Sequence, residues 1–222
     1  HIAEGIKDFN AGYYRRKNNN FDAKISLKWD VNQIPGLSLK TYASLIYDTS
    51  FQKDWGKTYN LYTLNRQTGN YDVFRATPEG SFSDTVLEQG TSYSNQYVLQ
   101  ESINYDQTFG DHSVSALALM EVQKAQGENF SGRRQDFQST LIDQLFAGSL
   151  ENQGADGGEY RENRLGFVGR LSYDYKSKYF FESTIRHDGS SRFAPGKEWG
   201  TFPSASIGWR LSEEYFFEPL KN

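Results

Sequence analysis

The chain has 222 residues, a formal net charge of −4 at pH 7, 36% hydrophobic and 16% aromatic residues, and no cysteine. Disulfide scaffolds, thiolate metal sites and cysteine nucleophiles are therefore excluded, and the modest negative charge argues against nucleic acid as the main partner. No apolar run approaches the ~18 residues that a transmembrane helix needs. A membrane β-barrel is not excluded, because its strands are only half apolar.

The first predicted strand covers residues 21–31, with the sequence FDAKISLKWDV. Its odd positions are apolar, and a period of two places odd and even positions on opposite faces of a strand. The even positions are polar: Asp22, Lys24, Ser26, Lys28 and Asp30. The apolar face either packs into the core of a soluble sandwich or contacts lipid in an outer-membrane barrel, whose charged face then lines a lumen.

Further strands are predicted in chain order at 37–47, 95–106, 113–122, 164–175, 179–188 and 202–212. Short turns separate them at 32–36, 107–112 and 176–178, and long polar loops lie at about 48–94, 123–162 and 189–201. A short helix is predicted at 137–148 within the second long loop. In an up-and-down meander, alternate connections lie at the same rim, so the short turns collect at one rim and the long loops at the other, as in outer-membrane barrels.

Aromatic residues gather near the ends of the predicted strands. One group flanks the turn at 176–178, and the aromatics near the short turns are Tyr173, Tyr175, Tyr179, Phe180, Phe181, Trp209 and Trp29, with Phe202 at the opposite end. Girdles of aromatics at both interfaces are expected for a membrane barrel, although ordinary aromatic packing at sheet ends remains an alternative. Because bacterial barrels have an even number of strands and close on themselves, seven strands predict one part of a larger barrel.

Residues 170–217 contain a long ordered string of short motifs. They comprise a Tyr-x-Tyr pair before a turn, a Lys-Tyr restart, the segment RHDGSSRF, the segment WGTFPS, a Gly-Trp-Arg triplet and a Glu-x-Phe turn. The residues are Tyr173, Tyr175, Lys178, Tyr179, Arg186, Asp188, Gly189, Ser190, Ser191, Arg192, Phe193, Trp199, Gly200, Phe202, Pro203, Ser204, Gly208, Trp209, Arg210, Glu214 and Phe216. This string closely resembles the barrel of SusC/RagA-type TonB-dependent transporters of the Bacteroidetes outer membrane.

The resemblance implies an all-β fold, an antiparallel up-and-down meander that is part of a 22-stranded transmembrane barrel. Residues 1–222 are then a partial barrel domain, with the plug domain and the remaining strands absent. It also implies that the whole protein actively imports oligosaccharides or peptides across the cell outer membrane with TonB-derived energy. The implied partners are a SusD-like surface lipoprotein at the extracellular loops, TonB through the upstream plug, and outer-membrane lipid. No cofactor and no nucleic-acid partner are implied.

No catalytic constellation and no metal site are predicted, because the histidines do not converge and no nucleotide-binding, hydrolase or zinc motif occurs. Alternation predicts lumen-facing residues: Asp22, Lys24, Lys28, Asp30, Arg164, Arg170, Asp174, Glu182 and Arg186. Aromatics in the long loops are candidates for stacking on sugar rings or for contacting a partner, or they pack the loops together; they include Trp55, Tyr59, Tyr62 and Tyr71. The segment 187–193 could bind a ligand through Asp188 and Arg192, but a structural role as a bend is favoured.

Three other functions stay open at this point. A passive porin or assembly barrel shares the strands and needs no plug. A soluble carbohydrate-binding β-sandwich shares the alternation and the aromatics. A glycoside hydrolase would need two converging carboxylates, and nothing in the sequence singles out such a pair.

Overall fold

The structure is a computed structural model that describes residues 2–3, 11–76 and 85–220. Part of the first predicted long loop (77–84) and the last two residues of the chain lie outside the described residues. The strands are β1 Ile2–Ala3, β2 Gly12–Asp30, β3 Leu37–Lys57, β4 Tyr59–Leu64, β5 Tyr71–Ala76, β6 Thr85–Phe109, β7 His112–Gln135, β8 Gly154–Tyr175, β9 Tyr179–Ser190 and β10 Trp199–Trp209. Short 3-10 helices lie at η2 Leu145–Ala147, η3 Leu211–Glu213 and η4 Tyr215–Leu220. No helix among the described residues has the length and hydropathy to cross a membrane.

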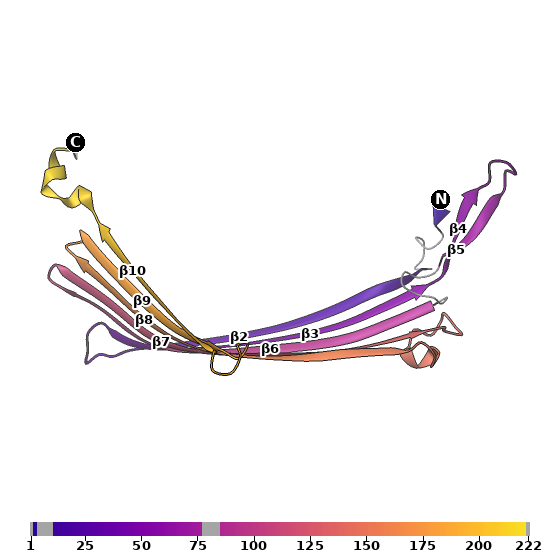
Figure 1. Cartoon of the computed structure of the whole chain (residues 1–222), viewed down its shortest axis with the longest axis horizontal. Helices are drawn as coiled ribbons and strands as arrows, with labels where there is room; N and C mark the ends of the chain where they lie inside the picture. Colours follow the sequence, from indigo (N-terminus) through magenta and orange to yellow (C-terminus); the bar gives the residue numbers. More distant parts are fainter. Residues whose placement is uncertain (1, 4–10, 77–84, 221–222) are drawn as a thin grey trace. The chain divides into compact units, whose positions relative to one another are not determined.

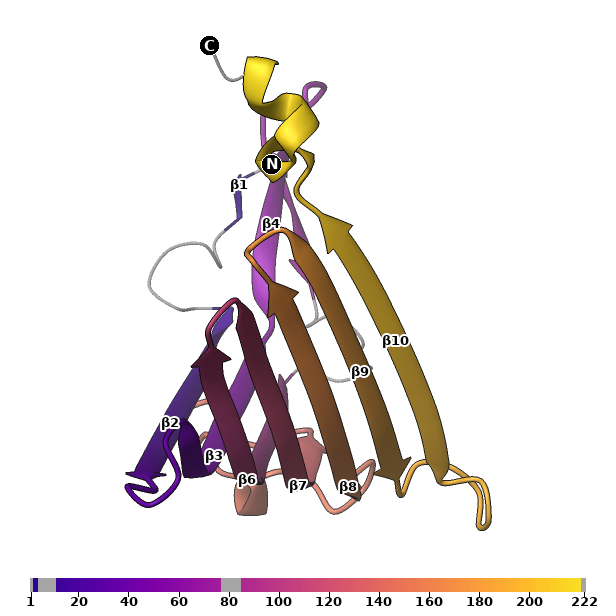
Figure 2. The same ribbon diagram turned by 90° about the vertical axis from the view of Figure 1, so that its left-hand side faces the viewer.

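One seven-stranded sheet dominates the fold, with the order β10-β9-β8-β7-β6-β3-β2. Its strands follow one another in the chain order, and Figure 2 shows β6 to β10 side by side. β4 and β5 form a separate hairpin that belongs to a three-stranded sheet with β1 (Figure 1). The expected all-β antiparallel meander is confirmed.

The connections keep the predicted division by length, but the strands are longer than predicted. β3, β6, β7 and β8 extend well into the regions assigned to the first two long loops, and β2 begins at Gly12. These extensions were missed because polar residues occupy both faces of the strand there, as in GADGGEYREN at 154–163, so no alternation marks them. The helix predicted at 137–148 is wrong apart from the single turn of η2.

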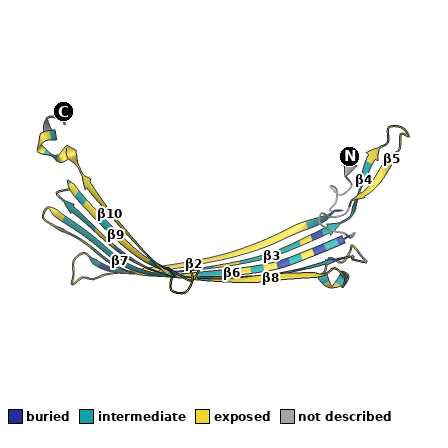
Figure 3. Ribbon diagram, viewed as in Figure 1, coloured by how far each residue is buried: buried dark blue, intermediate teal, exposed yellow. Residues whose placement is uncertain are grey.

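The chain divides into two compact units. Unit 1 comprises 1–20, 47–94 and 127–160, and unit 2 comprises 21–46, 95–126 and 161–222. The fully buried side chains Trp55 and Leu87 lie in unit 1, where Figure 3 shows the buried parts of β3 and β6.

The small core of unit 1 is built by the loop that follows β7. Phe137 packs edge-on against Trp55, with ring centroids 4.6 Å apart and planes at 87°. Asp143 of the same loop accepts a hydrogen bond from the hydroxyl of Tyr13, and Nζ of Lys53 lies 3.1 Å from its carboxylate. The hydrogen bond from Tyr13 is the main cause that lowers the pKa of Asp143. This loop is therefore held by both apolar and ionic contacts.

Candidate functional site

The register of β8, β9 and β10 assigns their side chains to two faces. Residues directly opposite in antiparallel strands share a face, and the pairs Arg170↔Thr184 and Thr184↔Ser204 define one of them. We call this the polar face; it carries Arg164, Gly166, Val168, Arg170, Ser172, Asp174, Phe180, Glu182, Thr184, Arg186, Asp188, Ser190, Gly200, Phe202, Ser204, Ser206 and Gly208. The opposite face, the apolar face, carries Leu165, Phe167, Gly169, Leu171, Tyr173, Tyr175, Tyr179, Phe181, Ser183, Ile185, His187, Gly189, Trp199, Thr201, Pro203, Ala205, Ile207 and Trp209.

Two clusters of stacked rings bound the apolar face. Tyr179 stacks between Tyr175 and Trp209, with centroids 6.3 and 6.4 Å away. Ten residues before Trp209 in β10, Trp199 stacks on His187 at 4.7 Å and on Phe167 at 6.4 Å. At ~3.3 Å per residue and a strand tilt of ~40°, the two clusters are about 25 Å apart along the barrel axis. That matches the height of the apolar band of a membrane barrel.

The side chains between these two clusters are exposed. Ile185 is 52% exposed and Ile207 is 87% exposed. Exposed apolar surface of this extent marks an interaction with a membrane or a partner. Two predicted girdle residues do not belong here, because the register places Phe180 opposite Gly208 and Phe202 opposite Arg186, on the polar face. Their assignment to the girdles is therefore wrong.

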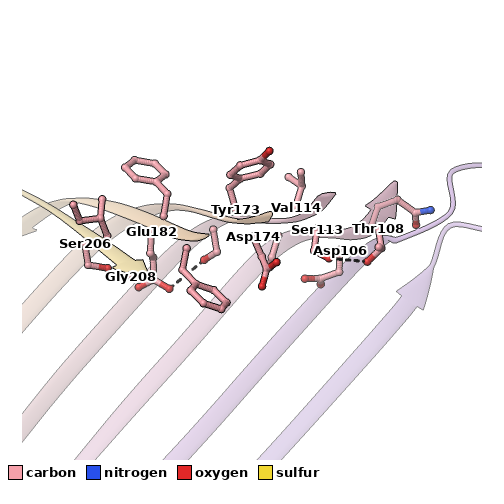
Figure 4. Close-up of a pocket in the computed structure, with 15 residues that line it drawn as sticks. Asp106, Thr108, Ser113, Val114, Tyr173, Asp174, Glu182, Ser206 and Gly208 are labelled. Atoms are coloured by element: carbon pink, nitrogen blue, oxygen red, sulfur yellow. Dashed lines mark hydrogen bonds between the residues drawn. The ribbon is translucent and has the colours of Figure 1, made fainter. Parts of the chain in front are cut away.

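The polar face is hollowed near the short turns of unit 2. Figure 4 shows this cavity of about 840 Å³, to which β6 to β10 all contribute. In the figure, Tyr173 and Val114 point to one side of the sheet, whereas Asp106, Asp174 and Glu182 point to the other. Ser172 donates a hydrogen bond to Glu182 at 3.1 Å. Three carboxylates from three strands therefore share this part of the polar face.

The predicted lumen-facing residues of β8 and β9 share the polar face. On β2, Lys24 pairs with Asp22 at 2.7 Å and Lys28 pairs with Asp30 at 2.8 Å, which places each pair on one face. Such exposed pairs add little to stability, because solvent screens them. The contacts do not show whether these faces line a lumen, which stays a prediction.

The segment RHDGSSRF folds as a compact corner between β9 and β10. Arg186 makes two hydrogen bonds of 3.2 Å to Asp188. A Cβ built on Gly189 would lie 3.0 Å from the ring of Trp199, so a side chain at this position would press on the indole. The backbone N–H of Ser191 donates to Asn163 at 3.0 Å, and the hydroxyl of Ser191 accepts from the N–H of Asn163 at 2.9 Å.

Glu162 completes this corner, and the sequence reasoning missed it. Its carboxylate, 12% exposed, lies 2.7 Å from Nη2 of Arg192 and 2.5 Å from Nη2 of Arg164. The available sequence signal was the position of Glu162 two residues before Arg164. This spacing places both side chains on the polar face if the predicted strand is extended to include residue 162. These contacts give Arg192 a role in fixing the loop; its role as a ligand-binding residue has no support among them.

Glu162→Ala is expected to release the 191–198 loop. The substitution leaves two guanidinium groups unpaired and costs about 1–2 kcal/mol, discounted because both arginines are exposed. Trypsin cleavage after Arg192 and Lys197 should become faster in the intact protein, with Glu151→Ala in another loop as the control. Equal cleavage rates in the two variants would contradict the role given to Glu162.

Glu214 anchors the segment after β10 to the turn between β8 and β9. Its carboxylate accepts hydrogen bonds from Tyr179 at 2.5 Å, from Trp209 at 3.0 Å and from Lys178 at 3.2 Å. These bonds, with that of Tyr179 the largest, lower the pKa of Glu214. The contact therefore stabilises the fold above the ordinary pKa of glutamate and is lost as the pH falls through the lowered value.

A nitroxide at Ser212 is expected to become mobile as the pH falls through the lowered pKa of Glu214. The transition should follow protonation of Glu214. In Glu214→Gln, the mobility of the label should therefore not change with pH. Electron paramagnetic resonance line shapes measured across acidic pH test this. An unchanged transition in the glutamine variant would assign the effect to another group.

The predicted loop aromatics have different environments. Trp55 is 2% exposed in the core of unit 1, where the loop after β7 buries it. Of the two alternatives for this residue, contact with cargo or a partner is therefore wrong, and packing against a loop is what the structure shows. Tyr59 and Tyr62 lie on β4, and Tyr71, 57% exposed, lies opposite Leu64 on β5. Their role as contacts for cargo or a partner stays a prediction. The described residues contain no group of three or more potential metal ligands.

No family model matches the chain. It is 30% identical over 228 residues to TonB-dependent receptor P39 of Formosa agariphila, covering 97% of this chain and 21% of that protein. It is 45% identical over 60 residues to TonB-dependent receptor SusC of Bacteroides thetaiotaomicron, covering 27% of this chain and 6% of that protein. These relatives are named as receptors, not as enzymes.

Solved structures share the fold. The RagAB peptide transporter superposes with a TM-score of 0.72 at 17% identity, covering 92% of this chain and 21% of that chain. The RagAB peptide importer in its 'open-open' state gives the same values. The chain spans about a fifth of the length of P39 and of RagAB chains. On these sequence matches, the chain belongs to the SusC-type TonB-dependent receptors.

Proposed function

We propose that this chain forms part of the barrel wall of an outer-membrane transporter that imports oligosaccharides or peptides. The observation that carries the proposal is the two-faced sheet of β8 to β10. Its apolar face is exposed and bounded by ring clusters about 25 Å apart. A soluble sandwich would bury this face, whereas a bilayer solvates it.

The polar face would then line the lumen of a large, 22-stranded type of barrel. Its charged residues, which include Arg170, Asp174 and Glu182, would hold a plug domain through ion pairs and hydrogen bonds or border the path of the cargo. The cargo passes through without covalent change, and no cofactor is needed.

Membership of the receptor family supports the proposed energy source and partner. TonB would supply energy through a plug domain, and a SusD-like lipoprotein would cover the long loops at the cell surface. The location is the cell outer membrane of a Bacteroidetes-type bacterium. A passive porin, the second candidate, would share the wall but not the dependence on energy.

Uptake by intact cells tests the proposal. Cells that carry the whole protein should accumulate labelled oligosaccharides or peptides, and the accumulation should stop when TonB is deleted or the proton gradient is collapsed. Uptake that persists without TonB would favour the passive pore. A protein that is washed from the membrane fraction by urea would contradict a barrel altogether.

A further inference from the structure

One exposed aromatic ring in unit 1 lies against a glycine. A Cβ built on Gly127 of β7 would lie 2.4 to 3.1 Å from three atoms of the Tyr160 side chain on β8. Gly127 is buried, whereas Tyr160 is 53% exposed. The ring therefore rests close to the backbone of Gly127, while about half of the Tyr160 side chain stays open to solvent.

The neighbours of this ring on the same face are polar. Asn129 shares the face because it lies two residues beyond Gly127. Gly90 of β6 lies on the same face as Ser131 of β7 and Gln52 of β3, because a Cβ built on Gly90 would lie 3.3 Å from Ser131 and 3.5 Å from Gln52. Because side chains alternate between the two faces of a strand, Ser92 and Ser94 of β6 share the face of Gly90, and Asp48 and Ser50 of β3 share the face of Gln52.

β2 extends the same surface. Arg16 donates hydrogen bonds of 3.2 Å to Ser50 and to Asn18, and Asn20 donates one of 2.7 Å to Asp48. Tyr93 and Glu128 bond to each other and lie on the opposite face, by the same alternation. A cavity of about 460 Å³ is lined by residues of this surface, Arg16, Ser50, Ser94, Asn129 and Tyr160 among them.

The chemistry of the surface selects the ligand. Amide and hydroxyl side chains both donate and accept hydrogen bonds, as the hydroxyls of a sugar do. The exposed aromatic ring of Tyr160 suits the apolar C–H surface of a pyranose. Arg16 and Asp48 balance in charge, and the surface offers no aliphatic pocket for the apolar side chains of a peptide.

We propose that Tyr160 is the stacking platform of a subsite for neutral oligosaccharides, with Asn129, Asn18 and Ser94 as hydrogen-bonding partners. The proposal rests on the proposed import function and narrows its cargo at this site. Gly127 supports the platform, because any side chain there would displace the ring.

Binding of short neutral oligosaccharides of several linkages to the purified intact protein tests the subsite. Tyr160→Ala should weaken the affinity about tenfold, the value of one aromatic contact, whereas Tyr160→Phe should stay within about twofold because the ring remains. Gly127→Ala should weaken binding through displacement of the ring. Tyr215→Ala, an exposed tyrosine of unit 2 (85%), is the matched control.

The outcomes separate the two proposals. Binding and uptake of oligosaccharides that are indifferent to Tyr160→Ala would overturn the subsite and leave the transporter intact. Binding of a peptide mixture in place of oligosaccharides would overturn the ligand class. If cells that carry the unmodified protein take up neither oligosaccharides nor peptides, the transport function itself is contradicted.

Discussion

Ala205→Arg is expected to destabilise the barrel by about 2–4 kcal/mol, the cost of a cationic side chain near the midplane of a bilayer. Ala205 lies on the apolar face, four residues from Trp209 and six from Trp199 on β10. The free energy of unfolding of the intact protein in lipid vesicles, from a denaturant titration, measures the effect.

Ser204→Arg is the matched control, since the two positions are adjacent and both side chains are small. Ser204 faces the polar side, opposite Thr184, so its substitution should cost less than about 1 kcal/mol. Equal costs at the two positions would mean that the apolar face does not contact lipid. A larger loss of unfolding free energy at Ser204 than at Ala205 would mean that the polar face, and not the apolar face, contacts lipid.

Trp55→Ala is expected to cost about 3–5 kcal/mol of stability in unit 1, as for other buried aromatic residues. The cavity would open against Phe137 and Leu87 and would free the loop at 136–153 from the sheet. Local stability can be followed by proteolysis of that loop and by hydrogen exchange in the intact protein.

Phe146→Ala is the control for this prediction. Phe146 lies in the same loop but is 76% exposed, so its truncation should change stability by less than about 0.5 kcal/mol. Loss of cargo binding in Trp55→Ala with unchanged loop protection would restore the discarded interpretation of Trp55 as a ligand contact.

Alternation predicted the seven strands wherever one face is apolar, because only there do the two faces differ in composition. It failed along residues such as Asn18, Asn19 and Asn20, where both faces are polar and the strand is recognised only by its ladder. The misassigned Phe202 followed from judging aromatics by their distance from a turn. Counting parity from Trp209 along the same strand would have placed Phe202 on the opposite face.

The candidate site was predictable within a strand but not between strands. The motif identified Arg192, yet its partner Glu162 lies about thirty residues earlier and meets it only through the pairing of β8 with β9. The contact of Tyr160 with Gly127 and the burial of Trp55 likewise depend on register and on a returning loop. A single sequence carries no local signal for either contact.

Spin labels along β10 can show whether one face of the sheet contacts lipid and the other a water-filled lumen. The chain contains no cysteine, so single cysteines can be placed at successive positions from 200 to 208 in the intact protein. In lipid vesicles, accessibility to molecular oxygen should peak at odd positions and accessibility to a water-soluble nickel chelate at even positions, with a period of two. Odd positions shielded from both reagents would place the apolar face in a protein core and contradict the account.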